Sequence, residues 1–196
     1  ADKAGDEQAL PKIAAEVRNF DLASYLPGAE RWDEYSRNTK FALAAAQMAV
    51  THSRLNEYAK LDRSRFGIYL GSGEGQQDFP RFVDLVYRTS HGGHVNTAEF
   101  TRSGLKTLHT IREAEQEPGT PAGHLAAQFG ARGVNANCLT ACAASSQAIG
   151  EAVEQIRRGD ADVILSGGTH SMIHPFGVTG FNLLTALSTR NDEPTR

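Results

Sequence analysis

The stretch from Val134 to Gly168 constrains the fold more than any other part of the chain. Residues 134–139 alternate between polar and apolar side chains, and a run of small residues then leads into apolar positions at helical spacing. Gly159 ends that helix, and a short apolar run at 163–165 is closed by two glycines. Strand, helix and strand in this order predict a β-α-β unit whose two strands are parallel and joined by a right-handed crossover.

Cys142 lies where the first of these strands gives way to the helix. The first turn of a helix carries N–H groups without intrahelical partners and a partial positive charge. Both favour a thiolate over a thiol, and the same N–H groups can stabilise an oxyanion on an attacked carbonyl. The small residues 143–146 would leave room for a substrate. Two interpretations of Cys142 stay open at this point: a nucleophile, or a small buried hydrophobic side chain.

The composition excludes several classes of protein. A chain of 196 residues can bury a substantial core, and a net charge of −3 carries no sign of nucleic-acid binding. The only two cysteines, Cys138 and Cys142, argue against a disulfide framework, and Cys138 is expected to be a packed strand residue. No apolar run is long enough to span a bilayer, and no signal peptide opens the chain. We therefore expect a cytoplasmic protein, or one of an organelle stroma or matrix, without a nucleic-acid or membrane partner.

The remaining elements are expected from apolar spacing and from helix breakers. Residues 1–35 are mixed and charged and predict an irregular start. We expect a strand at 65–71 and helices at 37–55, 97–112 and 123–129.

The glycine-rich segment 71–75 follows the expected strand and suggests a dinucleotide-binding site. The pattern G-x-G-x-x-G fails, however, because Gln76 stands where the third glycine is needed, and no phosphate-loop lysine follows. A tight turn is the better prediction for this segment.

Histidines are the other candidates for chemistry. His91 and His94 lack a third ligand, so they predict a solvated loop rather than a metal site. His170 and His174 are four residues apart, but Pro175 follows at once, so a helix that presents both on one face is not expected. We expect both to be structural or on the surface.

Several motifs together carry a resemblance to a known family. They are Arg65-Phe-Gly-Ile-Tyr-Leu-Gly-Ser-Gly73, Thr140-Ala-Cys142-Ala-Ala-Ser, Gly159-Asp-Ala-Asp-Val163, Ser166-Gly-Gly168, Gly180-Phe181 and Ala186-Leu-Ser-Thr-Arg-Asn-Asp192. The chain resembles the β-ketoacyl-acyl carrier protein synthases of the elongating type II kind, in the thiolase superfamily. The match is nearly continuous from about Arg37 to the end, and the block around Cys142 with the later Ala-Leu-Ser-Thr-Arg-Asn run is highly specific.

The resemblance implies an α/β fold of the thiolase-like, layered kind, in which a mixed, largely parallel sheet is packed between helices. It implies that residues 1–196 form a single, incomplete N-terminal ketosynthase domain, with the nucleophile unit at 134–168. A homodimer is implied as well, because the strand that matches 134–139 lies at a two-fold interface in the family.

The resemblance also implies an acyltransferase that forms carbon–carbon bonds in fatty-acid chain elongation. Cys142 would take an acyl chain from acyl carrier protein as a thioester. A malonyl group on a second carrier protein would then lose CO2, and the resulting carbanion would attack that thioester. Phe181 matches a position that lines the acyl pocket in the family. This chemistry requires no metal and no cofactor.

The sequence departs from the family at two places. The family carries its two catalytic histidines, a lysine and a second oxyanion donor on a second half, and the chain stops at Arg196 before any of them. We therefore expect the 196-residue polypeptide alone not to condense substrates. Residues 183–185 also differ from the Gly, Ala and Arg character expected there, where an arginine in some relatives helps to receive the carrier protein.

Other interpretations stay open. One is a ketosynthase of polyketide assembly. Another is a non-catalytic, chain-length-determining partner subunit, which Cys142 disfavours because such relatives usually lack the active cysteine. A thiolase proper and a generic α/β binding domain fit the motifs less well.

Overall fold

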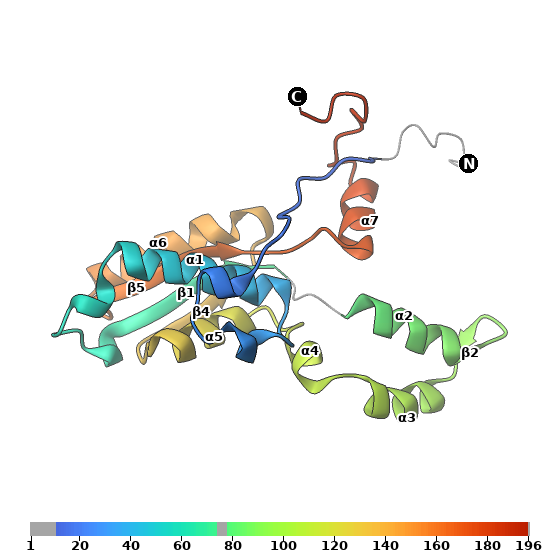
Figure 1. Cartoon of the computed structure of the whole chain (residues 1–196), viewed down its shortest axis with the longest axis horizontal. Helices are drawn as coiled ribbons and strands as arrows, with labels where there is room; N and C mark the ends of the chain where they lie inside the picture. The colour runs from blue at the N-terminus through green and yellow to red at the C-terminus, as the bar shows by residue number, and fades with distance from the viewer. Residues whose placement is uncertain (1–10, 74–77, 196) are drawn as a thin grey trace. The chain divides into compact units, whose positions relative to one another are not determined.

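The computed structural model describes residues 11–73 and 78–195, and Figure 1 labels its elements. The chain divides into two compact units. We call Asp21–His170 the sheet unit, and Ala1–Phe20 together with Ser171–Arg196 the terminal unit. Residues 74–77 include the last two residues of the predicted glycine turn, which therefore lie outside the described residues.

A three-stranded parallel sheet forms the centre of the sheet unit. Its strands are β1 (Phe66–Ser72), β4 (Asn135–Cys138) and β5 (Val163–Thr169), in the order β4-β1-β5. β1 is buried on both faces, as its apolar sequence predicts for a central parallel strand. The two strands of the predicted β-α-β unit are parallel as expected, but β1 lies between them.

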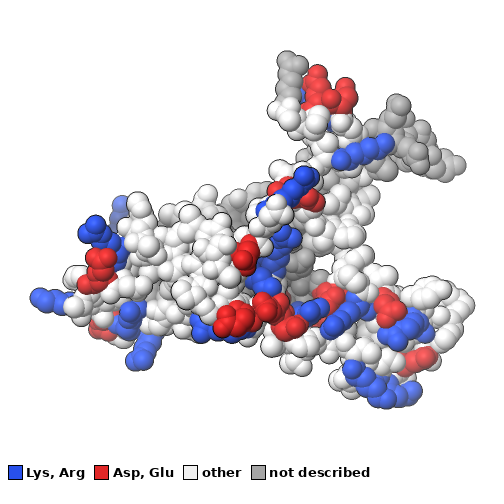
Figure 2. All heavy atoms as spheres, viewed as in Figure 1, with Lys and Arg blue, Asp and Glu red and all other residues white. Residues whose placement is uncertain are grey.

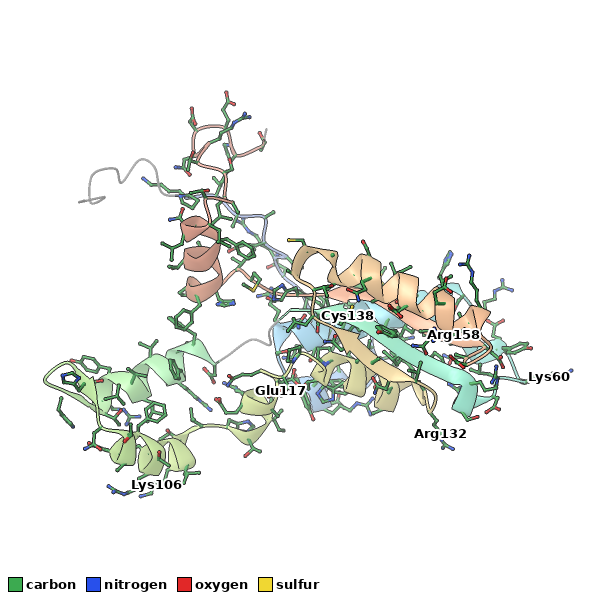
Figure 3. The ribbon with its side chains drawn as sticks, turned by 180° about the vertical axis from the view of Figure 1, so that it is seen from behind. Lys60, Lys106, Glu117, Arg132, Cys138 and Arg158 are labelled. Atoms are coloured by element: carbon green, nitrogen blue, oxygen red, sulfur yellow. The ribbon has the colours of Figure 1, made fainter. Side chains whose placement is uncertain are left out.

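Helices cover both faces of this sheet (Figure 1). α6 (Ala144–Arg157) lies along one face and packs against all three strands. α1 (Arg37–His52) and α5 (Thr120–Phe129) pack against each other and against the sheet on its other face (Figure 3). The predicted α/β architecture, a parallel sheet between helices, is confirmed.

α6 is apolar on two sides. Ala148 and Ala152 are buried against the sheet, whereas Ile149, Val153 and Ile156 are 50%, 41% and 43% exposed on the adjacent side. An apolar strip this wide is typical of a helix that contacts more than one neighbouring layer.

Several boundaries differ from the predictions. α1 ends at His52, because Arg54 adopts a left-handed φ of 57° and a 3-10 turn follows. α5 begins three residues earlier than expected, at Thr120, since a proline suits the first turn of a helix. The other short 3-10 elements are η2 (Leu22–Ser24), η3 (Ala29–Trp32), η4 (Leu55–Glu57) and η5 (Arg63–Arg65).

The segment after β1 forms α2 (Phe79–Arg88), the hairpin strands β2 (Ser90–His91) and β3 (His94–Val95), α3 (Thr97–Thr107) and α4 (Thr110–Ala114). The predicted single helix at 97–112 is wrong, because Leu108 is extended and separates α3 from α4. The loop predicted for His91 and His94 is a two-residue hairpin instead, since Gly92 and Gly93 supply the positive φ values that a tight turn needs.

Charged side chains of both signs lie close together on part of the surface. Over α2, α3 and α4, Lys and Arg alternate with Asp and Glu on the face that Figure 2 shows. No helix within residues 11–73 and 78–195 is both long and apolar enough to cross a membrane.

The terminal unit contains a helix that the sequence did not predict, α7 (Pro175–Leu183). His174 caps it, because its Nδ1 accepts a hydrogen bond from the Gly177 N–H at 3.3 Å. The expected structural role of His174 is therefore confirmed.

A buried carboxylate joins three segments of the sheet unit. Glu115 is 2% exposed and accepts hydrogen bonds from the N–H and hydroxyl of Ser36, from the hydroxyl of Thr39 and from Nε2 of His124. Burial alone would raise the pKa of Glu115, but the hydrogen bonds from His124, Thr39 and Ser36 outweigh it and hold the pKa below its usual value. One carboxylate thus fixes the start of α1 to α5.

We predict that Glu115→Gln lowers the free energy of unfolding by about 1–3 kcal/mol at pH near 7, because the charge-assisted hydrogen bonds are lost. Since the folded-state pKa is lowered, this stabilisation is complete above the pKa of an unfolded glutamate and is lost as the pH falls through the lower folded value. Urea unfolding across this range measures the difference. Glu117→Gln, two residues away and exposed, is the control (Figure 3), and an equal effect of both substitutions would contradict the prediction.

Candidate active site

The three parallel strands end at one edge of the sheet, which we call the carboxyl edge. The register pairs Gly71 of β1 with Cys138 of β4 on one side and with Gly168 of β5 on the other. Figure 3 shows Cys138 at this edge, whereas Arg132 and Arg158 lie at the opposite one. Because Arg158 follows the last residue of α6, α6 runs antiparallel to the strands and begins at the carboxyl edge.

The start of α6 lies directly on two of these strand ends. A Cβ on Gly71 would lie 2.3 Å from the carbonyl carbon of Ala144, and a Cβ on Gly168 would lie 2.6 Å from the Cβ of Ser145. Any side chain at either glycine would displace the helix. Both glycines and the small residues of the helix start are therefore needed for this contact, in which Gly71 meets the helix backbone and Gly168 meets the side chain of Ser145.

Cys138 of β4, the third strand, stabilises the same contact with a hydrogen bond. Its side chain is 8% exposed, and its Sγ donates a hydrogen bond to the carbonyl oxygen of Ala144 at 2.9 Å. The prediction that Cys138 is a packed strand residue is confirmed. Its thiol is used structurally, at the point where the strand turns back into the helix.

Cys142 lies just before this contact, in the 3-10 turn η6 (Ala141–Ala143). Its thiol is free and exposed, so the interpretation as a buried hydrophobic side chain is wrong. Ala141, next to it, has a left-handed φ of 49°, which costs an alanine about 1 kcal/mol or more. A strained turn that presents an exposed thiol is more typical of a functional site than of a structural one.

No N-cap side chain caps the first turn of α6, and no acidic residue in that turn neutralises its partial positive charge. Its N-cap residue is Ala143, which has no polar side-chain atom, and the first turn holds no acidic residue. The amides and the positive end of a 14-residue helix therefore face the carboxyl edge beside Cys142. This arrangement can bind an anionic or polarised oxygen and favours negative charge on a nearby sulfur.

Phe181, the second predicted site residue, lies in α7 of the terminal unit and is half-buried. It lines a cavity of about 510 Å³ within that unit, together with apolar side chains of the segment 11–18 and of α7 and its flanks, including Ile13, Ala14, Met172, Ile173, Val178 and Leu187. Cys142 belongs to the other unit, and that the two residues meet stays a prediction.

The histidines considered in the sequence lie at different places in the structure. His91 lies in the short hairpin, with Nε2 3.0 Å from a carboxylate oxygen of Glu99. Among the residues that the structure describes, no group of three His, Cys, Asp or Glu side chains is arranged to hold a metal ion. His170, which was expected to be structural or on the surface, is the first residue beyond β5 and so lies at the carboxyl edge with Cys142. The signal that could have found it is its place directly after the Ser-Gly-Gly-Thr end of that strand.

Comparison with known proteins gives a consistent result. The family model described as "Beta-ketoacyl synthase, N-terminal domain" matches residues 2–196. A 3-oxoacyl-(acyl-carrier-protein) synthase 2 of Staphylococcus aureus is 29% identical over 182 residues, which are 92% of this chain and 41% of that protein. A chloroplastic 3-oxoacyl-(acyl-carrier-protein) synthase I of Hordeum vulgare is 31% identical over 96% of this chain and 39% of its own length. The chain thus spans about two fifths of the length of these relatives.

Solved structures share the fold. A β-ketoacyl synthase of Burkholderia phymatum superposes with a TM-score of 0.72 at 24% identity, over 92% of this chain and 41% of that one. A structure of a type II polyketide acyl-carrier protein in complex with its ketosynthase superposes with a TM-score of 0.67 at 25% identity, over 87% of this chain and 45% of that one.

We predict that Gly71→Ala destabilises the protein by about 1–3 kcal/mol, because its Cβ would overlap the backbone of Ala144. The matched control is Gly150→Ala within α6, where a Cβ meets nothing within 4 Å and alanine should stabilise the helix by about 0.5–1 kcal/mol. Thermal unfolding followed by circular dichroism measures both. A Gly71→Ala variant as stable as the parent would show that the helix start is not held by this contact.

Proposed function

The chain belongs to the β-ketoacyl synthase family, through the N-terminal domain of that family, and we propose that it supplies the nucleophile of a decarboxylating condensation. Cys142 accepts an acyl chain from a carrier protein as a thioester. That thioester is then attacked by the carbanion that forms when a malonyl thioester loses CO2. The product is a β-ketoacyl chain that is longer by two carbons.

One observation carries the proposal. Cys142 is exposed in a strained turn, directly ahead of a helix whose first-turn amides its N-cap residue leaves uncapped. A thiol in this position can attack a carbonyl, while the amides beside it stabilise the oxyanion that forms. The contact of α6 with Gly71 and Gly168 fixes these amides relative to the sheet. A rigid sulfur and rigid donors are what an acyl transfer needs.

Loading of the acyl chain balances without a further reactant. The Cys142 thiol gives up its proton, its sulfur attacks the thioester carbonyl of the carrier, and the carbonyl oxygen becomes an oxyanion. The carbon–sulfur bond to the carrier then breaks, the carrier leaves as a free thiol with that proton, and the acyl chain stays on Cys142. The later loss of CO2 needs groups that stabilise an enolate, which the family resemblance places on the second half of such enzymes.

The proposed partners follow from the relatives. The curated relatives are named for the acyl carrier protein, and one structural neighbour is a ketosynthase in complex with such a carrier. We propose a carrier protein bearing acyl and malonyl thioesters as the substrate donor, and the cavity beside Phe181 as part of the acyl pocket. A cytoplasmic location is part of the same proposal, by analogy with bacterial chain elongation.

Fatty-acid elongation is the first choice, because the curated relatives are named 3-oxoacyl-(acyl-carrier-protein) synthases and the sequence motifs resemble the elongating type II enzymes. Polyketide extension is the second candidate, since the structural neighbours include a ketosynthase of a type II polyketide system and a ketosynthase with its chain length factor. A non-catalytic chain-length subunit is disfavoured by the exposed thiol of Cys142.

We predict that Cys142→Ala abolishes acylation by a pantetheine-linked acyl thioester, whereas Cys138→Ala retains it. Cys142 offers its sulfur at the carboxyl edge, and Cys138 has its sulfur buried and bonded to Ala144. Intact-protein mass spectrometry, followed by peptide mapping, measures the added acyl mass and its site. Acyl groups found on Cys138 rather than on Cys142 would overturn the assignment of the nucleophile.

We also propose a homodimer in which β4 faces its copy across a two-fold axis. β4 is an edge strand, so the side of it that faces away from β1 is free to meet a second chain. The carbonyl of Val134 accepts from Ile68 of β1, and alternate residues of a strand bond to opposite neighbours, so the N–H of Asn135 points away from β1.

We predict that Asn135→Pro weakens the dimer at least about tenfold, because proline removes that outward N–H without touching the bonds to β1. Asn135→Ala keeps the N–H and serves as the control. Light scattering coupled to size exclusion, on the protein that carries this chain, measures the mass against concentration. A parent protein that stays monomeric at every concentration would count against the dimer.

A further inference from the structure

The imidazole of His170 rests on the end of β1. A Cβ on Gly73 would lie 2.3 Å from two atoms of the His170 ring, so the ring packs directly against the glycine backbone. The register pairs Ser72 with Thr169 as the last residues of β1 and β5, and Gly73 and His170 are the next residue of each chain segment. The ring therefore leans from β5 across to β1, at the carboxyl edge of the sheet.

The ring also lies on the face of the sheet that α6 covers. Alternate residues of a strand face the same side, and along β1 this series is Tyr69, Gly71 and Gly73. Tyr69 packs against the cluster that α6 forms with the sheet, and Gly71 meets the backbone of Ala144 at the helix start. The His170 ring on Gly73 is the next group along this face. It thus lies just beyond the first residue of α6.

Cys142 projects beyond the same edge by a similar amount. From Gly168, which meets Ser145, two residues of strand advance His170 by about 6.6 Å. Cys142 precedes Ser145 by three residues, and α6 runs antiparallel to the strands, so going back along the chain leads toward the edge. At the rise of a helical turn, these three residues place Cys142 about 4.5–6 Å beyond Ser145. Both side chains are exposed, and both residues lie beyond the carboxyl edge on the side of α6.

The surroundings leave the imidazole available. Within residues 11–73 and 78–195, His170 forms no hydrogen bond or ion pair, unlike His91, His124 and His174. The other titratable groups on this face are Cys138, whose sulfur is bonded to Ala144, and Tyr69 and Glu151, which lie farther from the edge. Burial, followed by the charge of Glu151, raises the pKa of Tyr69, so this phenol stays neutral.

We propose that His170 activates Cys142 for acyl loading by accepting its proton. The proton passes from Sγ of Cys142 to a ring nitrogen of His170, and the thiolate attacks the thioester carbonyl. As the carbon–sulfur bond to the carrier breaks, the departing sulfur takes the proton back from the imidazolium. His170 exchanges protons with the reacting sulfur atoms, so its proposed role is that of a general base and then a general acid, additional to the histidines that the resemblance assigns to the second half. The inference rests on the proposed function.

The test is the rate at which iodoacetamide alkylates Cys142, measured by mass spectrometry between about pH 5.5 and 9 in the protein that carries this chain. Wild type should show an inflection in the range where imidazole titrates, between about pH 5 and 8. His170→Gln should remove the inflection and lower the rate near neutral pH at least about fivefold. His52→Gln, an exposed histidine at the end of α1, is the control and should change neither.

His170→Asn guards against a folding defect, and circular dichroism checks both variants. Superimposable pH profiles of wild type and a folded His170 variant would overturn the inference. A separate arm measures acylation of wild type by a pantetheine-linked acetyl thioester. If wild type is not acylated in this measurement, the proposed function is contradicted. A lost inflection in His170→Gln would still support the thiol–imidazole pair in that case.

Discussion

The contact between the start of α6 and the ends of β1 and β5 is the constraint on which the rest of the site depends. It is made by backbone, because Gly71 and Gly168 carry no side chain and the helix residues above them are small. Cys138 adds a hydrogen bond from the third strand to the same carbonyl region. The helix start, its amides and the turn with Cys142 are therefore set by three strands at once. A loop alone could not hold them to the same precision.

The sequence predicted the central unit well because its signals are local. Apolar spacing in α6, the arginines at its end and the glycine after it predicted the helix and where it ends, whereas Cys142, expected in its first turn, lies in η6 just before it. The strand at 65–71 followed from similar short patterns. These elements combine local propensity with burial, so pattern and packing agree.

What the sequence could not give was decided by tertiary contacts. The place of β1 between β4 and β5 depends on pairing between residues about seventy to a hundred positions apart. The break at Leu108 and the early end of α1 at His52 reflect backbone turns with no strong breaker residue. His170 was expected to be structural or on the surface, because Pro175 follows His174 and a helix that presents both histidines was not expected. Its position on Gly73 arises only when two strands end side by side.

Ile149, Val153 and Ile156 are partly exposed, so α6 carries an apolar strip beside its sheet-facing side that the described residues leave open to solvent.

Because the close contact of Gly71 and Gly168 with α6 leaves the helix no room to shift along the sheet, the turn with Cys142 stays at one position whatever molecule approaches it. In the proposed function, the sulfur that carries the acyl chain is therefore fixed relative to the sheet, and its position does not depend on the chain that it receives.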